Sequence, residues 1–322
     1  MSKPKIAICW LGSCGGCDEA VVDMNEVLLR VAGTVDIVLW PVAMDFKYDR
    51  LKKMKNGEIV LSVVNGNVRN SEQEEIAKLL REKSQLILAF GACACLGGTA
   101  GLANLSTRED IFNWVYRDAP TIVNPNGNYP QTTSRVNGKE LTLPELYNRV
   151  YALNAIIDVD YYLPGCPPPP YSVMYALSAV LENKLPSEGS TLAPHRALCD
   201  SCDRNRSKPD KISIRKIRRI HEVEAAPDTC FLAQGIICLG PATRDGCGVS
   251  CVNINMPCRG CFGPVEGVED SGAKFVSTMA SILDAESDEE VATVVNQFVD
   301  PVGYLYRFSL PVSTLRKKQV DK

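Results

Sequence analysis

Five short apolar runs in the first half of the chain predict the strands of a parallel sheet. They are rich in Val, Ile and Leu without regular polar alternation, a pattern typical of strands buried on both faces. Helical patterns lie between them, so the sequence predicts alternating strands and helices with right-handed crossovers. The five runs are 5–10, 34–40, 58–64, 86–90 and 159–163.

Helices are predicted at 18–30, 71–83 and 171–183, the second with Ser71 as its cap and an acidic first turn. The segment 104–153 is irregular and proline-rich, so we expect a long insertion that leaves the sheet and packs against another surface. From 186 onward the chain is rich in Cys, Pro and Gly, and helical patterns return at 273–283 and 288–298. The aromatic stretch 304–311 is expected to pack either on a partner or on its own domain.

The net charge and the first residues of the chain indicate the cellular compartment of the protein. A net charge of −3 over 322 residues gives no general attraction to nucleic acid or anionic lipid. The chain starts with Met-Ser-Lys-Pro-Lys and leads straight into a strand, and the apolar window 86–103 is broken by glycines. We therefore expect a cytoplasmic protein with neither a nucleic-acid nor a membrane partner.

Fourteen cysteines are many for such a chain and point to metal ligation, with disulfides as the alternative. Four of them follow predicted strands, and the carboxyl ends of parallel strands share one edge of a sheet. Four thiolates there suit a four-iron cluster or zinc, and their long spacing favours iron and sulfur. These four are Cys14, Cys17, Cys93 and Cys166.

Eight further thiols crowd the second half of the chain. They divide into two more sets of four, for clusters or for two zinc sites, because loops around a metal need little regular structure. They are Cys199, Cys202, Cys230, Cys238, Cys247, Cys251, Cys258 and Cys261.

Four motifs together resemble the small subunit of NiFe hydrogenases, most closely the cytoplasmic methyl-viologen-reducing type that feeds heterodisulfide reductase in methanogens. They are Cys14-Gly-Gly-Cys-Asp-Glu19, Gly91-Ala-Cys-Ala-Cys-Leu-Gly-Gly98, Pro164-Gly-Cys-Pro-Pro168 and Cys258-Arg-Gly-Cys-Phe-Gly-Pro264. The resemblance implies an α/β fold: a flavodoxin-like parallel sheet at 1–185, an irregular iron–sulfur domain at 186–270 and a helical tail at 271–322.

The resemblance also implies three [4Fe–4S] clusters, and it places the nickel–iron centre in a partner large subunit. By this likeness the proximal ligands are Cys14, Cys17, Cys93 and Cys166. The medial ligands are Cys247, Cys251, Cys258 and Cys261, and the distal ligands are Cys199, Cys202, Cys230 and Cys238.

The likeness has departures. Periplasmic relatives begin the distal set with a histidine, whereas Cys199 stands here and His195 is a fallback. Cys251 is available where some relatives have proline, so the medial cluster is expected to hold four irons. Cys9 is expected in the core, and Cys93 is preferred to Cys95 as a ligand.

The implied function is that of a non-catalytic electron-transfer subunit of an oxidoreductase, delivering electrons from H2 oxidation to an iron–sulfur acceptor subunit of heterodisulfide reductase. Glu19 is either a proton relay or a first-turn residue that favours the helix dipole. The basic run 204–219 offsets cluster charge, docks an acidic acceptor, or is a solvated helix. The alternatives are a deazaflavin- or NAD(P)-reducing hydrogenase, a subunit of a quinone-reducing complex, and a zinc-stabilised interaction protein.

Overall fold

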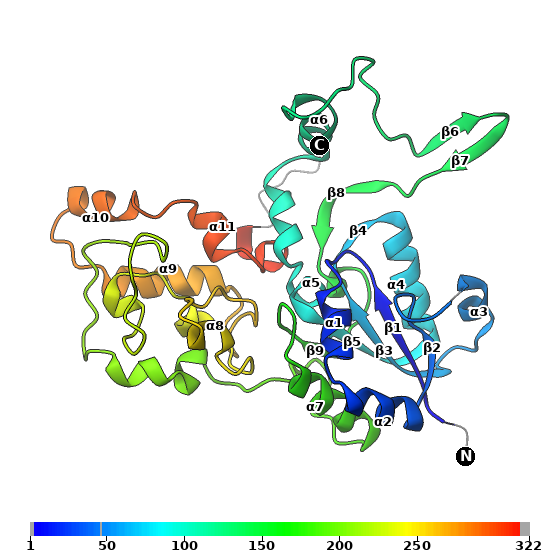
Figure 1. Ribbon diagram of the computed structural model, residues 1–322, viewed down its shortest axis with the longest axis horizontal. Coiled ribbons are helices and arrows are strands. Elements are labelled where there is room, and N and C mark those ends of the chain that lie inside the picture. The colour runs from blue at the N-terminus through cyan, green and yellow to red at the C-terminus, as the bar shows by residue number, and fades with distance from the viewer. Residues whose placement is uncertain (1–2, 46, 316–322) are drawn as a thin grey trace.

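A five-stranded sheet forms the centre of the first half of the chain (Figure 1). The computed structural model describes residues 3–45 and 47–315. The strand order is β2-β1-β3-β5-β9, and every neighbouring pair is parallel. This is the flavodoxin-like order 2-1-3-4-5, so the predicted α/β fold is confirmed. The strands are β1 (Lys5–Trp10), β2 (Asp36–Leu39), β3 (Ile59–Asn65), β5 (Ser84–Phe90) and β9 (Tyr161–Leu163).

Both faces of the sheet are buried, as the continuous apolar runs predicted. On β1, Ile6 and Ile8 pack into one core while Ala7 and Cys9 pack into the other. The alternation follows from the two-residue period of a strand. The core with Ala7 is covered by α3 (Tyr48–Lys53), α4 (Ser71–Lys83) and α5 (Gly91–Leu96), and the opposite core by α1 (Gly16–Val22), α2 (Glu26–Thr34) and α7 (Pro170–Leu181).

Two local predictions were wrong. The single helix expected at 18–30 is two helices, because the backbone turns at Asn25, whose φ is 51°. Asparagine tolerates this left-handed conformation, and its side-chain amide donates to the Asp23 carbonyl at 3.0 Å. The cap of α4 is Asn70, which accepts from Gln73 N, whereas Ser71 is already helical and accepts from Glu145 N.

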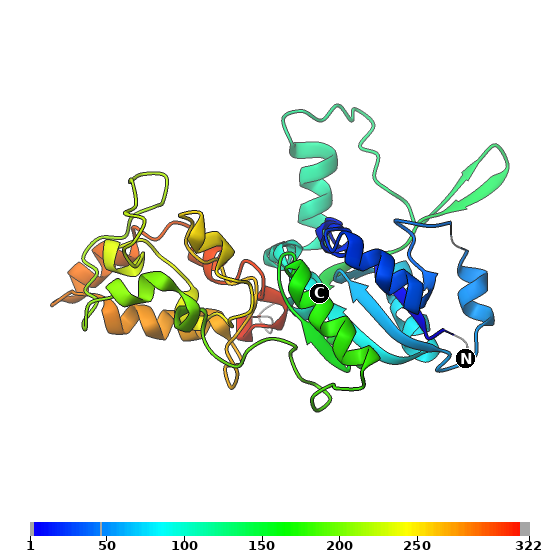
Figure 2. The same cartoon turned by 60° about the horizontal axis from the view of Figure 1, so that its bottom comes forward.

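The insertion expected at 104–153 contains more regular structure than its prolines indicated. Its last strand pairs with β4 beside the sheet, whereas the β6–β7 hairpin is exposed at every residue and projects with α6 away from the body (Figures 1 and 2). The elements are η1 (Thr99–Leu105), α6 (Arg108–Asn113), the π-helix η2 (Trp114–Asp118), β6 (Thr133–Val136), β7 (Lys139–Thr142), β8 (Leu146–Tyr151) and η3 (Leu153–Ala155), with β4 at Val68–Asn70.

The second half is made mainly of loops and short turns around a third core. This core joins residues between 198 and 258 with residues of the carboxyl-terminal helices, among them Tyr306 and Leu310. The aromatic stretch near the terminus therefore packs on its own chain. The elements are η4 (Leu198–Ser201), η5 (Asp203–Ser207), η6 (Leu232–Gln234), η7 (Gly240–Ala242), α8 (Ser250–Asn253), α9 (Ser271–Ile282), α10 (Asp288–Val295), α11 (Pro301–Leu305) and η8 (Leu310–Val312).

Helix α9 is tied to the terminal segment by a buried carboxylate. Asp270 caps α9 by accepting from Ala273 N at 2.9 Å, and it also accepts from the Thr314 backbone N and hydroxyl. Burial raises the pKa of Asp270, but these hydrogen bonds outweigh it and hold the pKa below its usual value. Within the described residues, no helix has the length and apolar character that a membrane span needs.

Candidate metal centres

One group of thiols lies at the carboxyl end of the parallel sheet. Cys14 follows β1 on an exposed loop, and Cys17 is buried in the first turn of α1. Cys93 lies in α5 directly after β5, and Cys166 follows β9. The topology thus brings together four cysteines that are up to 152 positions apart (166 minus 14).

The thiols of this group affect one another's pKa values. Burial raises the pKa of Cys93 to about 12, and the charges of Cys166 and Cys14 contribute to the rise. Burial likewise raises the pKa of Cys17, with Cys93 as the next largest cause. Metal binding requires thiolates, so it would release protons from this group.

Two glycines leave room for the sulfurs of this group. Gly91 has φ 84°, and an ideal Cβ there would lie 2.3 Å from Cys17 Sγ. Gly98 has φ 68°, and its Cβ would lie 2.4 Å from Cys93 Sγ. Both backbone positions suit only glycine without strain, and a methyl group at either would fill the space beside a thiol.

A buried carboxylate fixes the loop that carries Cys14. Asp18 is 3% exposed and accepts from Trp40 Nε1 at 2.8 Å and from Asn65 Nδ2 at 2.9 Å. The Asn65 amide oxygen accepts from the Ser13 hydroxyl, which in turn accepts from Gly15 N at 3.3 Å. This chain of hydrogen bonds connects the ends of β2 and β3 to the turn before α1. The sequence motif did not reveal this network, because its members are far apart along the chain.

A second group consists of Cys199, Cys202, Cys230 and Cys238. Burial raises the pKa of Cys199 to about 12, followed in size by the charges of Cys238, Cys230 and Cys202. Burial also raises the pKa of Cys238 to about 11, although the backbone N–H groups of Gly240 and Cys258 oppose the shift. The latter donates to Cys238 Sγ at 3.3 Å.

The remaining four candidate ligands, Cys247, Cys251, Cys258 and Cys261, make up the third expected group, and two of them have neighbours in the other groups. Burial raises the pKa of Cys261 to about 12, and Cys247 and then Cys166 contribute next. Cys166 belongs to the first group. On the other side, the largest effect on the pKa of Cys258 after burial comes from Cys238 of the second group. Together with the contact of Cys258 N with Cys238 Sγ, these effects indicate that the groups follow one another in a series.

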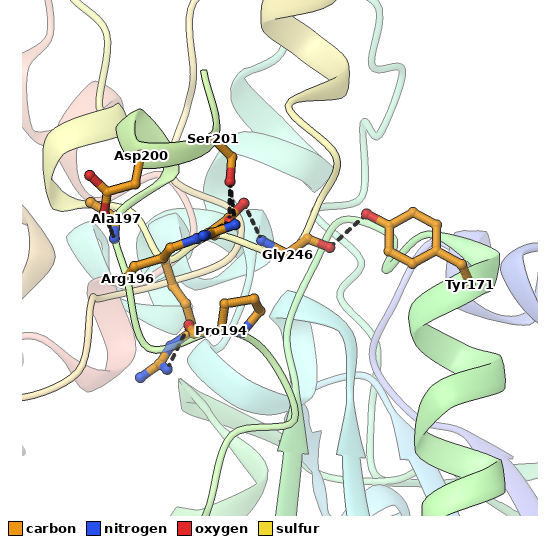
Figure 3. Close-up of polar contacts among 9 residues, drawn as sticks. Tyr171, Pro194, Arg196, Ala197, Asp200, Ser201 and Gly246 are labelled. Atoms are coloured by element: carbon orange, nitrogen blue, oxygen red, sulfur yellow. Dashed lines mark hydrogen bonds and ion pairs between the residues drawn. The ribbon is translucent and has the colours of Figure 1, made fainter. Parts of the chain in front are cut away.

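Hydrogen bonds between the sheet half and the loops of the second half hold this series together (Figure 3). Tyr171 of α7 donates through its hydroxyl to the Gly246 carbonyl at 2.8 Å, just before Cys247. Next to it, the buried Asp245 accepts from Arg196 Nε at 2.9 Å and from the Ser201 hydroxyl at 2.5 Å. These contacts together position the third group against both the helix after Cys166 and the loop of Cys199.

The carboxyl-terminal segment also supports the first group. Gly98 N donates to the Phe308 carbonyl at 3.0 Å. Pro311 packs so tightly that an ideal Cβ at Gly97 would lie 2.3 Å from its Cγ, and one at Gly101 would lie 2.4 Å away. The loop after Cys93 is therefore held by residues more than 200 positions later in the chain (311 minus 97 is 214).

The basic run 204–219 is not a solvated helix, so that alternative was wrong. Residues 208–219 are not helical, and Ile214 and Ile217 are buried. Arg204 is 7% exposed and lies over the Phe231 ring at 4.2 Å. Its guanidinium donates to Asn255 Oδ1 at 2.8 Å and to the Ala226 carbonyl at 3.1 Å. It joins the loops of the second group from within.

Four other residues were singled out from the sequence, and one of them, Cys95, is close enough to the first group to raise the pKa of Cys17. Cys9 is 3% exposed in the sheet core, and Cys95 is buried with its thiol donating to the Ala89 carbonyl at 3.3 Å. His195 contacts the Glu266 carboxylate. Glu19 is exposed in the first turn of α1.

The chemistry of the donor groups fits iron–sulfur ligation. All fourteen cysteines are free, so the disulfide alternative was wrong. Each group offers four thiolates, the set that holds a four-iron cluster. Within the part of the chain that the structure describes, no three His, Cys, Asp or Glu side chains are placed to hold one metal ion.

Known proteins match this chain over nearly its full length. It is 39% identical over 318 residues to the iron–sulfur subunit of the F420-non-reducing hydrogenase of Archaeoglobus profundus, covering 98% of each chain. It is 37% identical over 319 residues to a subunit of the F420-non-reducing hydrogenase of Methanothermobacter marburgensis, covering 98% of this chain and 97% of that one. A family model described as "NADH ubiquinone oxidoreductase, 20 Kd subunit" matches residues 14–180.

The fold has a counterpart among solved structures. The recombinant [NiFeSe] hydrogenase from Desulfovibrio vulgaris Hildenborough aligns with a TM-score of 0.52 and 17% identity, covering 83% of this chain and 95% of that chain. This likeness concerns the fold alone.

Fold, thiol pattern and relatives define the class as the small subunit of a hydrogenase, one component of an oxidoreductase complex that includes a large subunit. The family model ends at residue 180, whereas the relatives also span the eight later thiols. The chain belongs to the family of NiFe hydrogenase small subunits that includes these two subunits of F420-non-reducing hydrogenases.

Proposed function

We propose that this chain is the electron-transfer subunit of a cytoplasmic NiFe hydrogenase. It conducts electrons from H2 oxidation in the large subunit through three [4Fe–4S] clusters to an iron–sulfur subunit of a heterodisulfide reductase complex. The observation that supports the proposal is the close placement of cysteine sulfurs from distant parts of the chain. Cys258 N donates to Cys238 Sγ, and the sulfurs of Cys199 and Cys238 both lie beside Gly240.

The proposed ligands are the twelve cysteines of the three groups. The proximal set is Cys14, Cys17, Cys93 and Cys166; the medial set is Cys247, Cys251, Cys258 and Cys261; the distal set is Cys199, Cys202, Cys230 and Cys238. Clusters held in this way supply one-electron redox chemistry at potentials set by charge, hydrogen bonds and burial.

The residues of the chain itself bury and orient these ligands. The backbone N–H of Cys258 donates to Cys238 Sγ, a contact that favours the thiolate form of a distal ligand. Glycine at position 91 leaves the side of Cys17 open. The hydrogen bond from Tyr171 to Gly246 fixes the medial loop relative to the proximal one, and such fixed spacing is what a relay requires.

The acceptor is proposed from the relatives and from the resemblance. The relatives' name states that their hydrogenases do not reduce F420, which argues against a deazaflavin-reducing role. Membership of a hydrogenase family argues against a zinc-stabilised protein without redox role. The free thiols suit a reducing compartment, which supports the cytoplasm.

Anaerobic purification of the native complex tests the proposal. We expect at least twelve iron and twelve sulfide per copy of this chain, because three four-iron clusters require that many and the copurifying subunits add iron of their own. EPR signals should develop under H2. A large subunit and an iron–sulfur acceptor subunit should copurify. Zinc in place of iron would refute the cluster assignment, and a flavin-containing NAD(P)-reducing partner would refute the assigned acceptor.

Cysteine variants test the ligand assignment. Cys251→Ser should lower the iron content and alter the EPR signal of one cluster. Cys9→Ser is the matched control, because Cys9 is buried in the sheet core away from the groups and should leave the iron content unchanged. Equal iron loss in both variants would contradict the medial set.

A further inference from the structure

A basic cavity lies between the loops of the second half and the last helices. Its volume is about 180 Å³, and its lining includes a high density of guanidinium groups. No cysteine is among the described residues that line it, so it is separate from the thiol groups. Its charged lining residues are Arg218, Arg219, Arg259, Arg307 and Asp300, and His221 also lines it.

Two of these arginines carry buried N–H groups that lack a hydrogen-bond partner among the described residues. They are Nη1 of Arg259 and Nε of Arg307, and both atoms are inaccessible to solvent. Buried polar groups are nearly always hydrogen-bonded, and an exception calls for a missing partner. Of the three such side-chain atoms in the described part of the chain, two belong to residues that line this one cavity. The cavity is therefore lined by guanidinium groups whose hydrogen-bonding capacity is not fully used within the chain.

The guanidinium of Arg259 is held in place before any ligand arrives. It lies over the Tyr304 ring at 4.2 Å from the centroid. The Tyr304 hydroxyl donates to the Ile237 carbonyl at 2.6 Å, and Phe298 packs edge-on against the ring at 5.3 Å. A positioned guanidinium loses little side-chain entropy on binding.

The positive charge of the cavity is only partly neutralised from within. The arginine ion pairs formed between described residues all involve other arginines. Asp300 contributes one negative charge to the lining against four arginines, and its carboxylate also accepts from Gly303 N at 2.9 Å, where it caps α11. Arg218 and Arg219 are exposed and add two further positive charges at the opening.

We propose that this cavity binds a small oxyanion of the phosphate, sulfate or carboxylate type. Guanidinium groups match the planar oxygen pairs of such anions and make charge-assisted hydrogen bonds to them. The volume is below the roughly 300 Å³ at which sites for drug-sized ligands begin, so it suits a single small anion rather than a nucleotide. The site stands on these residues alone and is independent of the proposed electron relay.

The test is calorimetric titration of the full-length, cluster-loaded chain with inorganic phosphate and with sulfate at constant ionic strength. We expect saturable binding of one anion per chain and a raised thermal midpoint. Arg307→Gln should weaken binding roughly ten-fold or more, the effect of losing one charge-assisted hydrogen bond. Arg206→Gln is the matched control: it removes the same charge from an exposed side chain outside the cavity.

Arg218→Gln provides a second variant at the exposed opening, where folding is not at risk, and should weaken binding by a smaller factor. Repeating the titration on the assembled complex separates a free anion from a carboxylate that a partner inserts: binding persists in the first case and is blocked in the second. The proposal is overturned if neither anion binds to the isolated chain, or if Arg206→Gln weakens binding as much as Arg307→Gln.

Discussion

Replacing Gly91 with alanine tests how the sheet edge makes room for the proximal thiols. The backbone at Gly91 has φ 84°, and the new Cβ would lie 2.3 Å from Cys17 Sγ. An ordinary contact between such atoms is about 3.5 Å or more, so roughly 1.2 Å of movement is needed. The next nearest neighbour is the Gly165 carbonyl oxygen at 3.6 Å, so the thiol has to move.

Two costs combine in this variant. A left-handed conformation costs alanine about 1 to 2 kcal/mol, and overpacking a filled interior costs about 1 to 3 kcal/mol. Gly138→Ala isolates the first cost, because Gly138 has φ 77° with nothing within 4 Å of its Cβ. The difference between the two variants therefore measures the contact with the sulfur.

The measurements are the thermal midpoint and the iron content of both variants, prepared anaerobically in parallel. Gly138→Ala should hold as much iron as the unmodified chain. Gly91→Ala should be about 1 to 3 kcal/mol less stable than Gly138→Ala and should lose iron from one cluster. Identical iron contents and midpoints in the two variants would refute the idea that the missing Cβ makes room for Cys17.

Three further predictions concern buried polar groups. Arg204→Ala should lower the free energy of unfolding by about 2 to 4 kcal/mol, because it leaves buried acceptors unpaired. Arg206→Ala removes an 88% exposed side chain and should change the free energy of unfolding by less than about 0.5 kcal/mol. Equal effects would contradict the structural role of Arg204. Asp18→Asn should destabilise the chain by about 1 to 3 kcal/mol, since its new NH2 group faces one of the two donors, Trp40 Nε1 or Asn65 Nδ2, that the carboxylate accepts from. An unchanged midpoint would count against the network. Because the pKa of Asp270 is lowered in the fold, Asp270 stabilises the protein at pH values above the pKa of an unfolded aspartate, and this contribution is lost as the pH falls through the folded-state pKa. Asp270→Asn should therefore make the thermal midpoint fall less steeply with decreasing pH on the acid side. An unchanged acid dependence would argue against this role of Asp270.

The sheet could be predicted because its determinants are local. The composition of each of the five apolar runs is enough to predict a strand that is buried on both faces. The rule that crossovers are right-handed then limits how the strands can be connected. Residues 5–10 matched β1 in full. The break at Asn25 was missed because the apolar period continues across it, and only the φ of one residue ends the helix. The cap at Asn70 was missed because serine and asparagine are both good caps.

The thiol groups were only partly accessible to sequence reasoning. The first group follows from topology, since parallel strands end at one edge. The other eight thiols are on loops, where spacing does not reveal which sulfurs meet, and their division came from resemblance. Arg204 could not be separated from the rest of the basic run, because composition cannot show that a guanidinium is 7% exposed and satisfied by backbone carbonyls.

The loops that carry eight thiols have little regular structure, yet contacts from the sheet half and from the carboxyl-terminal segment fix their positions. Tyr171 ties the loop before Cys247 to the sheet half, and Pro311 packs on the glycines that follow Cys93. The same terminal region contributes Tyr306 and Leu310 to the core beneath the loops. Because electron transfer between fixed centres depends on their spacing, a terminal segment that touches both halves is well placed to maintain it. If the chain relays electrons as proposed, the carboxyl-terminal helices therefore help to hold the relay in place, although they contribute no thiol.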